Sequence, residues 1–167
     1  MSTVISSLAE LYTNVNARLE SALRDTMKEL LKELQDIIMR EVYSRPISGE
    51  NWDNRTYEFL ESWNTSEPIM VGDMVQSVLS QDGFNFTWNS DRGMWSHGNG
   101  WSQLAINSLD EIINNGLSES NFNFPDIEER PYWDMFKIYV EENVNMIFYK
   151  NCKKYGLPIM KIGYNFT

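Results

Sequence analysis

Residues 4–43 form a long periodic stretch that contains neither glycine nor proline. Apolar residues recur there at steps of three and four, the spacing that places side chains on one face of an α-helix. The positions are Leu8, Leu11, Tyr12, Val15, Leu19, Ala22, Leu23, Met27, Leu30, Leu31, Leu34, Ile37 and Ile38. Because Glu, Lys, Arg and Asp fill the opposite face, the sequence predicts one amphipathic helix over this stretch.

The expected length of this helix raises a question about its partner. Forty residues would extend roughly 60 Å at about 1.5 Å per residue, more than one small domain needs. We therefore expect part of the helix to pack on another chain. A bent or broken helix folded back on its own core is the alternative. Pro46 and Gly49 end the periodic stretch.

The segment Arg55–Trp63 joins this helix to the rest of the chain, and it predicts a short turn that leads into a strand. Beyond Pro68 the apolar period changes to two, which is typical of strands covered on one face. We read residues 69–79 as one continuing run, and Asp82-Gly83 as a tight hairpin. The alternating Phe84, Phe86 and Trp88 would then form the returning strand.

The C-terminal half predicts further helices. A short strand at 103–107 and a capped helix at 108–116 compete there with a single helix over 102–115. Pro131 suits a first helical turn, and an amphipathic pattern continues to about Tyr155 before Gly156. The fold class expected is α+β, in one domain over 1–167. Its parts are a long helix (1–45), mainly antiparallel strands (46–107), a short helix (108–116), a C-terminal helix packed on the sheet (131–156) and a strand-like tail (157–167).

Charge and cysteine content exclude several classes of protein. Residues 46–130 hold three Lys or Arg against fourteen Asp or Glu, a net charge of −11. Such a segment would repel a phosphate backbone, so we expect no sequence-specific binding of nucleic acid. The single cysteine, Cys152, rules out a disulfide within the chain. No apolar run is long enough to span a bilayer, and the N-terminus lacks a secretion signal, so no membrane association is expected.

The residues that usually carry chemistry form no recognisable constellation. His97 is the only histidine and lies in a Gly-rich loop, without a motif that supplies a nucleophile or companion ligands. Gly98-Asn99-Gly100 has the spacing of neither a dinucleotide fingerprint nor a P-loop. We therefore expect no catalytic residue, no cofactor-binding residue and no metal ligand, and hence no enzyme.

The order of short motifs along the chain resembles a known family. A long helix ends near Tyr43 and Pro46, and Arg-Thr-x-x-x-Leu-x-Ser follows at 55–62. Leu-x-x-Ile-Ile-x-x-Gly at 109–116 then precedes Arg-Pro-Tyr-Trp at 130–133. Over about 42–155 the chain resembles the neck proteins of long-tailed bacteriophages, which are small head–tail joining or tail-completion subunits. It departs from them at Tyr57, where the family often has glycine.

The resemblance implies a non-enzymatic virion protein that forms a ring, hexameric or dodecameric, between portal and tail tube. Its partners would be copies of itself and the portal or adaptor and tail proteins. DNA would pass through the ring without being bound, and an acidic lumen would suit that passage. The protein would reside in the virion neck, after assembly in the host cytoplasm. A non-viral acidic interaction module without catalysis is the alternative.

The candidate residues for subunit contacts or for the structural motif come from three stretches and two isolated tryptophans. They are Tyr43, Arg55, Thr56, Trp63, Trp95, Trp101, Arg130, Pro131, Tyr132 and Trp133. For the Arg55–Trp63 stretch, a structural role is expected first, with Phe59 and Trp63 in the core and Arg55 paired with a carboxylate. Setting the helix angle between neighbouring subunits is the second expectation.

Overall fold

The computed structural model describes residues 7–45, 57–82, 113–116 and 129–158. These ranges contain a long N-terminal helix, short antiparallel strands and a long C-terminal helix, so the α+β class expected from the sequence is confirmed. The strand expected at 84–88, the Gly-rich loop, the alternatives at 102–112 and the tail at 159–167 lie outside the described residues.

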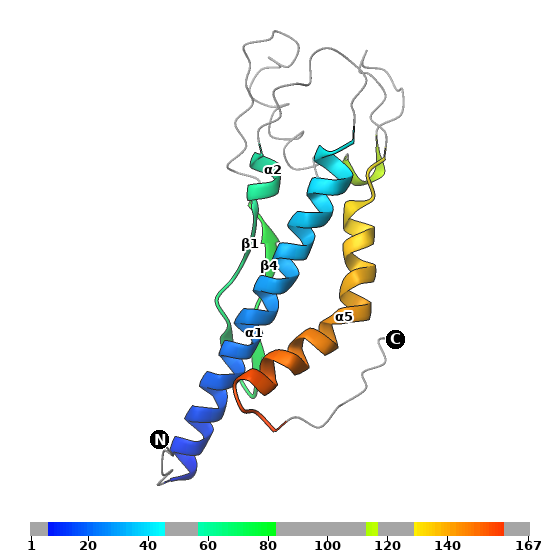
Figure 1. Ribbon diagram of the computed structural model, residues 1–167. Helices are drawn as coiled ribbons and strands as arrows, with labels where there is room; N and C mark the ends of the chain where they lie inside the picture. Colours follow the sequence, from blue (N-terminus) through cyan, green and yellow to red (C-terminus); the bar gives the residue numbers. More distant parts are fainter. Residues whose placement is uncertain (1–6, 46–56, 83–112, 117–128, 159–167) are drawn as a thin grey trace, which may run out of the picture. The chain divides into compact units, whose positions relative to one another are not determined.

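The chain divides into two compact units, and each unit contains part of both long helices. The first unit comprises Met1–Lys32, Thr65–Ser80 and Ile138–Thr167, and the second comprises Glu33–Asn64 and Gln81–Lys137. In Figure 1, α1 (Leu8–Ile38) runs from blue to cyan and α5 (Tyr132–Lys154) from yellow to red. Among the described helices, none is long and apolar enough to cross a membrane.

The ends of α1 follow from local chemistry. The Ser7 side chain accepts the backbone N–H of Glu10 at 3.1 Å, which satisfies one of the free donors of the first turn. At the other end, the chain widens into the π-helical turn η1 (Met39–Tyr43), where Ser44 N–H donates to the Met39 carbonyl at 2.9 Å. Turns of this kind are rare and recur at functional sites.

The strands form a hairpin that differs from the sequence expectation. After the single turn α2 (Glu58–Glu61), β1 (Trp63–Thr65) pairs with β4 (Leu79–Gln81), and β2 (Ile69–Val71) pairs with β3 (Met74–Gln76). The reading of 69–79 as one continuing run is therefore wrong, because the chain reverses within it at Gly72-Asp73. Val71 pairs with Met74 across a two-residue turn, and Gly72 has a φ of 62°, which glycine adopts without strain.

Within the first unit, the hairpin lies along α1. Arg24 donates to Glu67 at 2.7 Å, and the Tyr12 hydroxyl donates to Asp73 at 3.2 Å. The later of the two hairpin residues thus contacts the earlier of the two helix residues. Strand β2 therefore runs antiparallel to α1, and the turn at Gly72-Asp73 lies near the N-terminal turns of α1.

The same unit packs α5 on α1. Ala22, Cys152 and Leu157 form a buried cluster, against which Leu19, Phe148 and Tyr155 pack. The end of α5 is a Schellman motif, in which Gly156 N–H donates to the Lys153 carbonyl and Leu157 N–H to the Cys152 carbonyl, each at 3.0 Å. Gly156 has the required positive φ of 69°. The glycine signal in the sequence thus ends the helix and turns Leu157 into the core.

Candidate functional site: the aromatic cluster of the second unit

Aromatic side chains from α2, β1 and α5 meet in the second unit. Phe59, Trp63 and Tyr132 contact one another edge to face, with ring centroids 5.4 to 6.5 Å apart. Trp133 stacks on Trp63 at 5.2 Å, and Phe136 follows at 5.5 Å from Trp133. Edge-to-face and offset stacked pairs are the arrangements that the ring quadrupoles favour. The cluster therefore joins three elements through specific ring contacts.

Most of this cluster is inaccessible to solvent. Phe59, Tyr132 and Phe136 are buried, and Trp63 is 8% exposed. A platform that stacks bases or sugars presents its rings to solvent, together with basic residues. The burial of Trp63 fits a core role instead, as the sequence led us to expect.

The register of the β1–β4 ladder places a polar side chain beside Trp63. Asp82 N–H donates to the Ser62 carbonyl at 2.8 Å, and Ser66 N–H donates to the Val78 carbonyl at the same distance. These bonds put Gln81 directly opposite Trp63, on the same face of the ladder. The indole Nε1 and the Gln81 Nε2 are both buried donors without a hydrogen-bond acceptor among the described residues. An unsatisfied buried donor costs about 1–3 kcal/mol.

The start of α5 is held by a helical turn at residues 113–115. The Ile113 carbonyl accepts the Arg130 backbone N–H at 2.9 Å, and the Asn114 side chain accepts the Trp133 N–H at 3.0 Å. Asn114 also donates to Asp134 at 3.2 Å. Pro131, which has no N–H, accepts the first helical bond from Met135 through its carbonyl at 3.0 Å. The Arg-Pro-Tyr-Trp motif is therefore a helix start fixed by Asn114, a residue that the sequence analysis did not single out.

Arg130 connects this helix start to the end of α1. Its guanidinium donates to the Val42 carbonyl within the π-helical turn, across a sequence separation of 88 residues. Arg130 is 7% exposed and Val42 is half-buried, so the bond is largely shielded from solvent. Buried charged groups are tolerated only when they are paired or hydrogen-bonded. The contact joins two motifs of the resemblance that are far apart in the sequence.

Glu41 is the second buried charge near this turn, and sequence reasoning also missed it. Arg40 donates to its carboxylate at 2.9 Å, and Arg45 pairs with it as well. The hydrogen bond from Arg40 lowers the pKa of Glu41, and the hydrogen bond from Arg45 lowers it as well. Burial acts in the opposite direction and raises the pKa, but the net pKa is lowered. The only local signal was two arginines close to a glutamate at the end of a helix.

The structure brings together six of the ten residues proposed from the sequence. Trp63, Tyr132 and Trp133 belong to the aromatic cluster, and Arg130 and Pro131 immediately precede it. Tyr43, from the π-helical turn, stacks on Tyr57 with centroids 4.9 Å apart. The other four, Arg55, Thr56, Trp95 and Trp101, lie outside the described residues.

The described residues also bear on metal binding and on similarity to known proteins. In the parts of the chain that the structure describes, no group of three or more His, Cys, Asp or Glu side chains could hold a metal ion. No protein-family model, curated protein or solved structure matches this chain.

Proposed function

We propose that this chain is a structural subunit that forms a ring in the neck of a long-tailed bacteriophage, where it joins the head to the tail. The observation that carries the proposal is the Arg130–Val42 hydrogen bond together with its surroundings. This bond brings the motif that ends the long helix into contact with the motif that opens the C-terminal helix. Short degenerate motifs that meet in space support a shared architecture more strongly than their order alone.

The residues around the Arg130–Val42 hydrogen bond suit a structural scaffold. Its buried side chains are aromatic rings and charges that are ion-paired or hydrogen-bonded within the chain. Such groups fix the directions of the elements that they join, and they leave a rigid frame from which other surfaces can bind partners. The proposed partners are further copies of the chain, together with portal or adaptor and tail proteins.

Charge supports the passage of DNA without binding. The segment 46–130, with its net charge of −11, would repel phosphates wherever it faces a channel. We therefore expect no measurable affinity for duplex DNA at low salt in a fluorescence anisotropy titration. Tight binding that weakens steeply with added salt would contradict this part of the proposal.

The decisive experiment is imaging of particles together with the native mass of the purified protein. Antibody labelling or image reconstruction should place the chain in a ring at the head–tail joint, in a number of copies that closes the ring. Particles that lack the protein, with a purified chain that stays monomeric, would overturn the proposal. Gene neighbourhood gives an independent readout, because portal, capsid and tail-tube genes should flank the gene.

A further inference from the structure

The face of α1 that binds α5 continues toward the N-terminus with apolar side chains that are partly or largely exposed. Ala22 packs on Cys152 in the buried cluster, and Thr26 accepts a hydrogen bond from Asn151 at 3.1 Å. Steps of three and four residues from Ala22 lead to the α1 stripe, which we define as Leu8, Leu11 and Val15. These side chains are 86%, 42% and 40% exposed. Figure 1 shows the blue N-terminal turns of α1 extending past the red end of α5.

A second exposed apolar face belongs to α5. Ile138 and Met146 are 56% and 64% exposed, and Glu142 lies between them. Half-buried Tyr149 follows on the same side of the helix. We call Ile138, Glu142, Met146 and Tyr149 the outer face of α5. Buried Asn151 lies on the opposite side, toward α1, so α5 carries side chains suited to contact on both sides.

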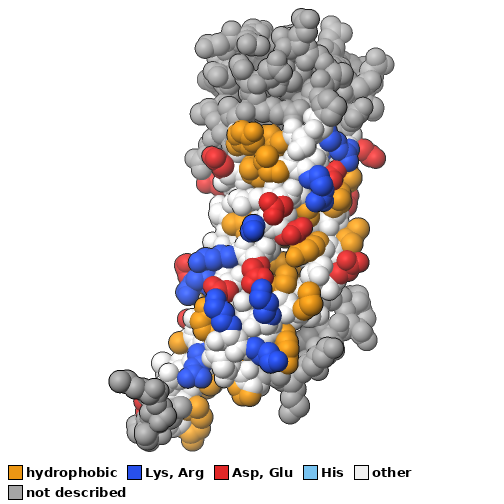
Figure 2. All heavy atoms as spheres, in the orientation of Figure 1, with side chains coloured by type: hydrophobic (Ala, Val, Ile, Leu, Met, Phe, Trp, Pro, Cys, Tyr) orange, Lys and Arg blue, Asp and Glu red, His pale blue; other side chains and the backbone are white. Residues whose placement is uncertain are grey.

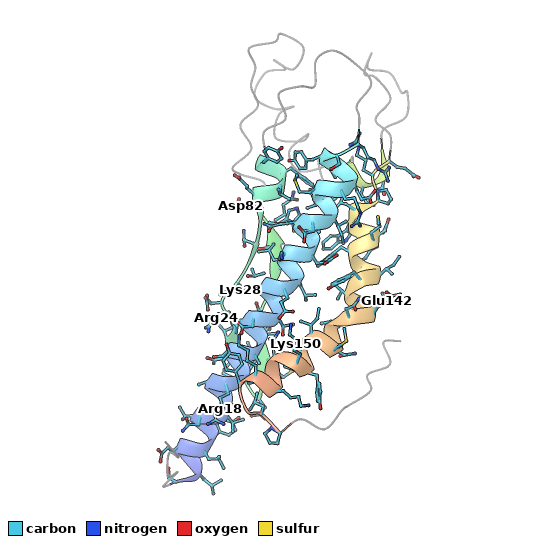
Figure 3. All side chains as sticks on the ribbon, viewed as in Figure 1. Arg18, Arg24, Lys28, Asp82, Glu142 and Lys150 are labelled. Atoms are coloured by element: carbon cyan, nitrogen blue, oxygen red, sulfur yellow. The ribbon has the colours of Figure 1, made fainter. Side chains whose placement is uncertain are left out.

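The two surfaces carry charges of opposite sign, Arg18 beside the α1 stripe and Glu142 on the outer face of α5. Arg18 follows Val15 by one turn on α1, and among the described residues it has no ion pair. Glu142 likewise has no ion pair within the described part of the chain. Figure 3 labels both side chains and shows Glu142 on the side of α5 away from α1. Two neighbouring lysines of this unit are already ion-paired, since Lys150 and Lys154 pair with Glu29 and Asp25, and Lys153 lies over the Tyr149 ring.

The spacings also agree. From Arg18, the α1 stripe continues at Val15 and Leu11, three and seven residues earlier. From Glu142, the outer face of α5 continues at Met146 and Tyr149, four and seven residues later. Both series cover about 10 Å of helix. An antiparallel pairing of the two helices therefore matches a positive with a negative charge at one end, and apolar with apolar side chains along the rest.

We propose that the α1 stripe of one copy packs on the outer face of α5 in the next copy, with Arg18 paired to Glu142. This contact rests on the proposed function, because it supplies the interface between ring subunits. It joins two different surfaces, so each copy can bind one neighbour through α1 and another through α5. Contacts of this kind close into rings when the rotation between copies permits.

Charge reversal tests the pairing. Arg18→Glu and Glu142→Arg should each weaken self-association by about tenfold or more, because like charges would then face one another. The double variant R18E/E142R should restore it. Lys28→Glu is the matched control, because Lys28 is exposed on another face of α1 and should leave assembly unchanged. Native mass spectrometry over a concentration series gives the readout.

Cysteine cross-linking tests the geometry, in solution and in purified particles. The native Cys152 is buried, so introduced thiols should react selectively. A mixture of Val15→Cys and Met146→Cys proteins should form disulfide-linked dimers, whereas neither protein alone should do so. Efficient self-linking of Val15→Cys would overturn the proposal in favour of a two-fold contact between α1 helices.

The outcomes separate this contact from the proposed function. Rings that tolerate both charge reversals and fail to cross-link would overturn the contact and leave the neck assignment standing. A chain that is monomeric in solution and absent from particles would overturn both. Rescue by the double variant, together with cross-linking only in the mixture, supports both.

Discussion

The two units stabilise their helix contacts by different chemistry. In the first, α1 meets α5 through a small apolar cluster beside a polar network, in which Thr26 and Asn151 are buried and hydrogen-bonded to each other. In the second, large aromatic rings make the contacts, and the buried charges sit around the π-helical turn. Figure 2 shows Lys or Arg and Asp or Glu side chains interleaved over the helices of the first unit.

This difference suggests different tolerance to change. Surface ion pairs contribute about 0–1 kcal/mol each, whereas deletion of a buried aromatic side chain costs about 3–5 kcal/mol. The second unit should therefore behave as the rigid part of the fold. The first unit, with its weaker polar contacts and exposed apolar faces, is better suited to adjust on binding a neighbour.

The largest effect is expected from Trp63→Ala in the second unit. Loss of the buried ring removes contacts with Phe59, Tyr132 and Trp133 and should lower the free energy of unfolding by about 3–5 kcal/mol. Tyr57→Ala is the control, since Tyr57 is 51% exposed and should cost much less. Denaturant titration measures both. A stable Trp63→Ala monomer that fails only to assemble would make this tryptophan an interface residue.

Arg130→Met should have the next largest effect. The apolar replacement retains much of the side-chain volume but removes the hydrogen bond that Arg130 donates to the Val42 carbonyl, at a cost of about 1–3 kcal/mol. Arg130→Lys keeps the charge yet lacks the planar fork, so it should fall between the wild type and Arg130→Met. Equal stability of all three proteins by thermal and denaturant unfolding would show that the bond does not hold the two motifs together.

The polar network of the first unit can be tested by a double-mutant cycle. Thr26→Val and Asn151→Leu should each lower stability by about 0.5–1.5 kcal/mol, because each removes the Thr26–Asn151 hydrogen bond. Asn151 keeps its bond to Glu29 in the first variant, and Thr26 keeps its bond to the Ala22 carbonyl in the second. The double variant should lose less than the sum of the two, with a coupling energy above about 0.5 kcal/mol. Additive losses would indicate that the two residues act independently, and the contrast between the units would then lose its basis.

The smallest effect is expected for the pH dependence of the stability that Asp25 contributes. Hydrogen bonds from Lys154 and Tyr155 lower the pKa of Asp25 in the folded chain. A folded-state pKa below the unfolded value of about 3.9 adds stability above that pH, and this stability is lost as the pH falls through the folded pKa. Asp25→Asn should thus be less stable than the wild type at neutral pH, by up to about 1 kcal/mol because Lys154 is mostly exposed. The stability difference between the wild type and Asp25→Asn should vanish in strong acid. A difference that is independent of pH would exclude the lowered pKa of Asp25 as its cause.

Helices and their ends were predictable because their signals are local. The absence of glycine and proline before Pro46, with apolar steps of three and four, predicted the long helix that α1 and η1 form. Gly156 likewise predicted the end of α5, since only a residue that accepts a positive φ completes the Schellman motif. The turn within 69–79 was missed because Gly72-Asp73 was read as part of a continuing strand. The hairpin expected at Asp82-Gly83 lies at the edge of the described residues and stays a prediction.

The sequence by itself determined the α+β class, the two long helices and the start of α5 after Pro131, because each depends on residues within a few positions of one another. Only the tertiary structure decided which polar groups are buried. Arg130 and Asn151 look like ordinary surface residues in the sequence, and both have hydrogen-bond partners in elements far away along the chain. Glu41 is buried as well, although its partners Arg40 and Arg45 are its neighbours in the sequence. Arg130 is the clearest case, because its acceptor lies 88 residues away and no periodicity could reveal it.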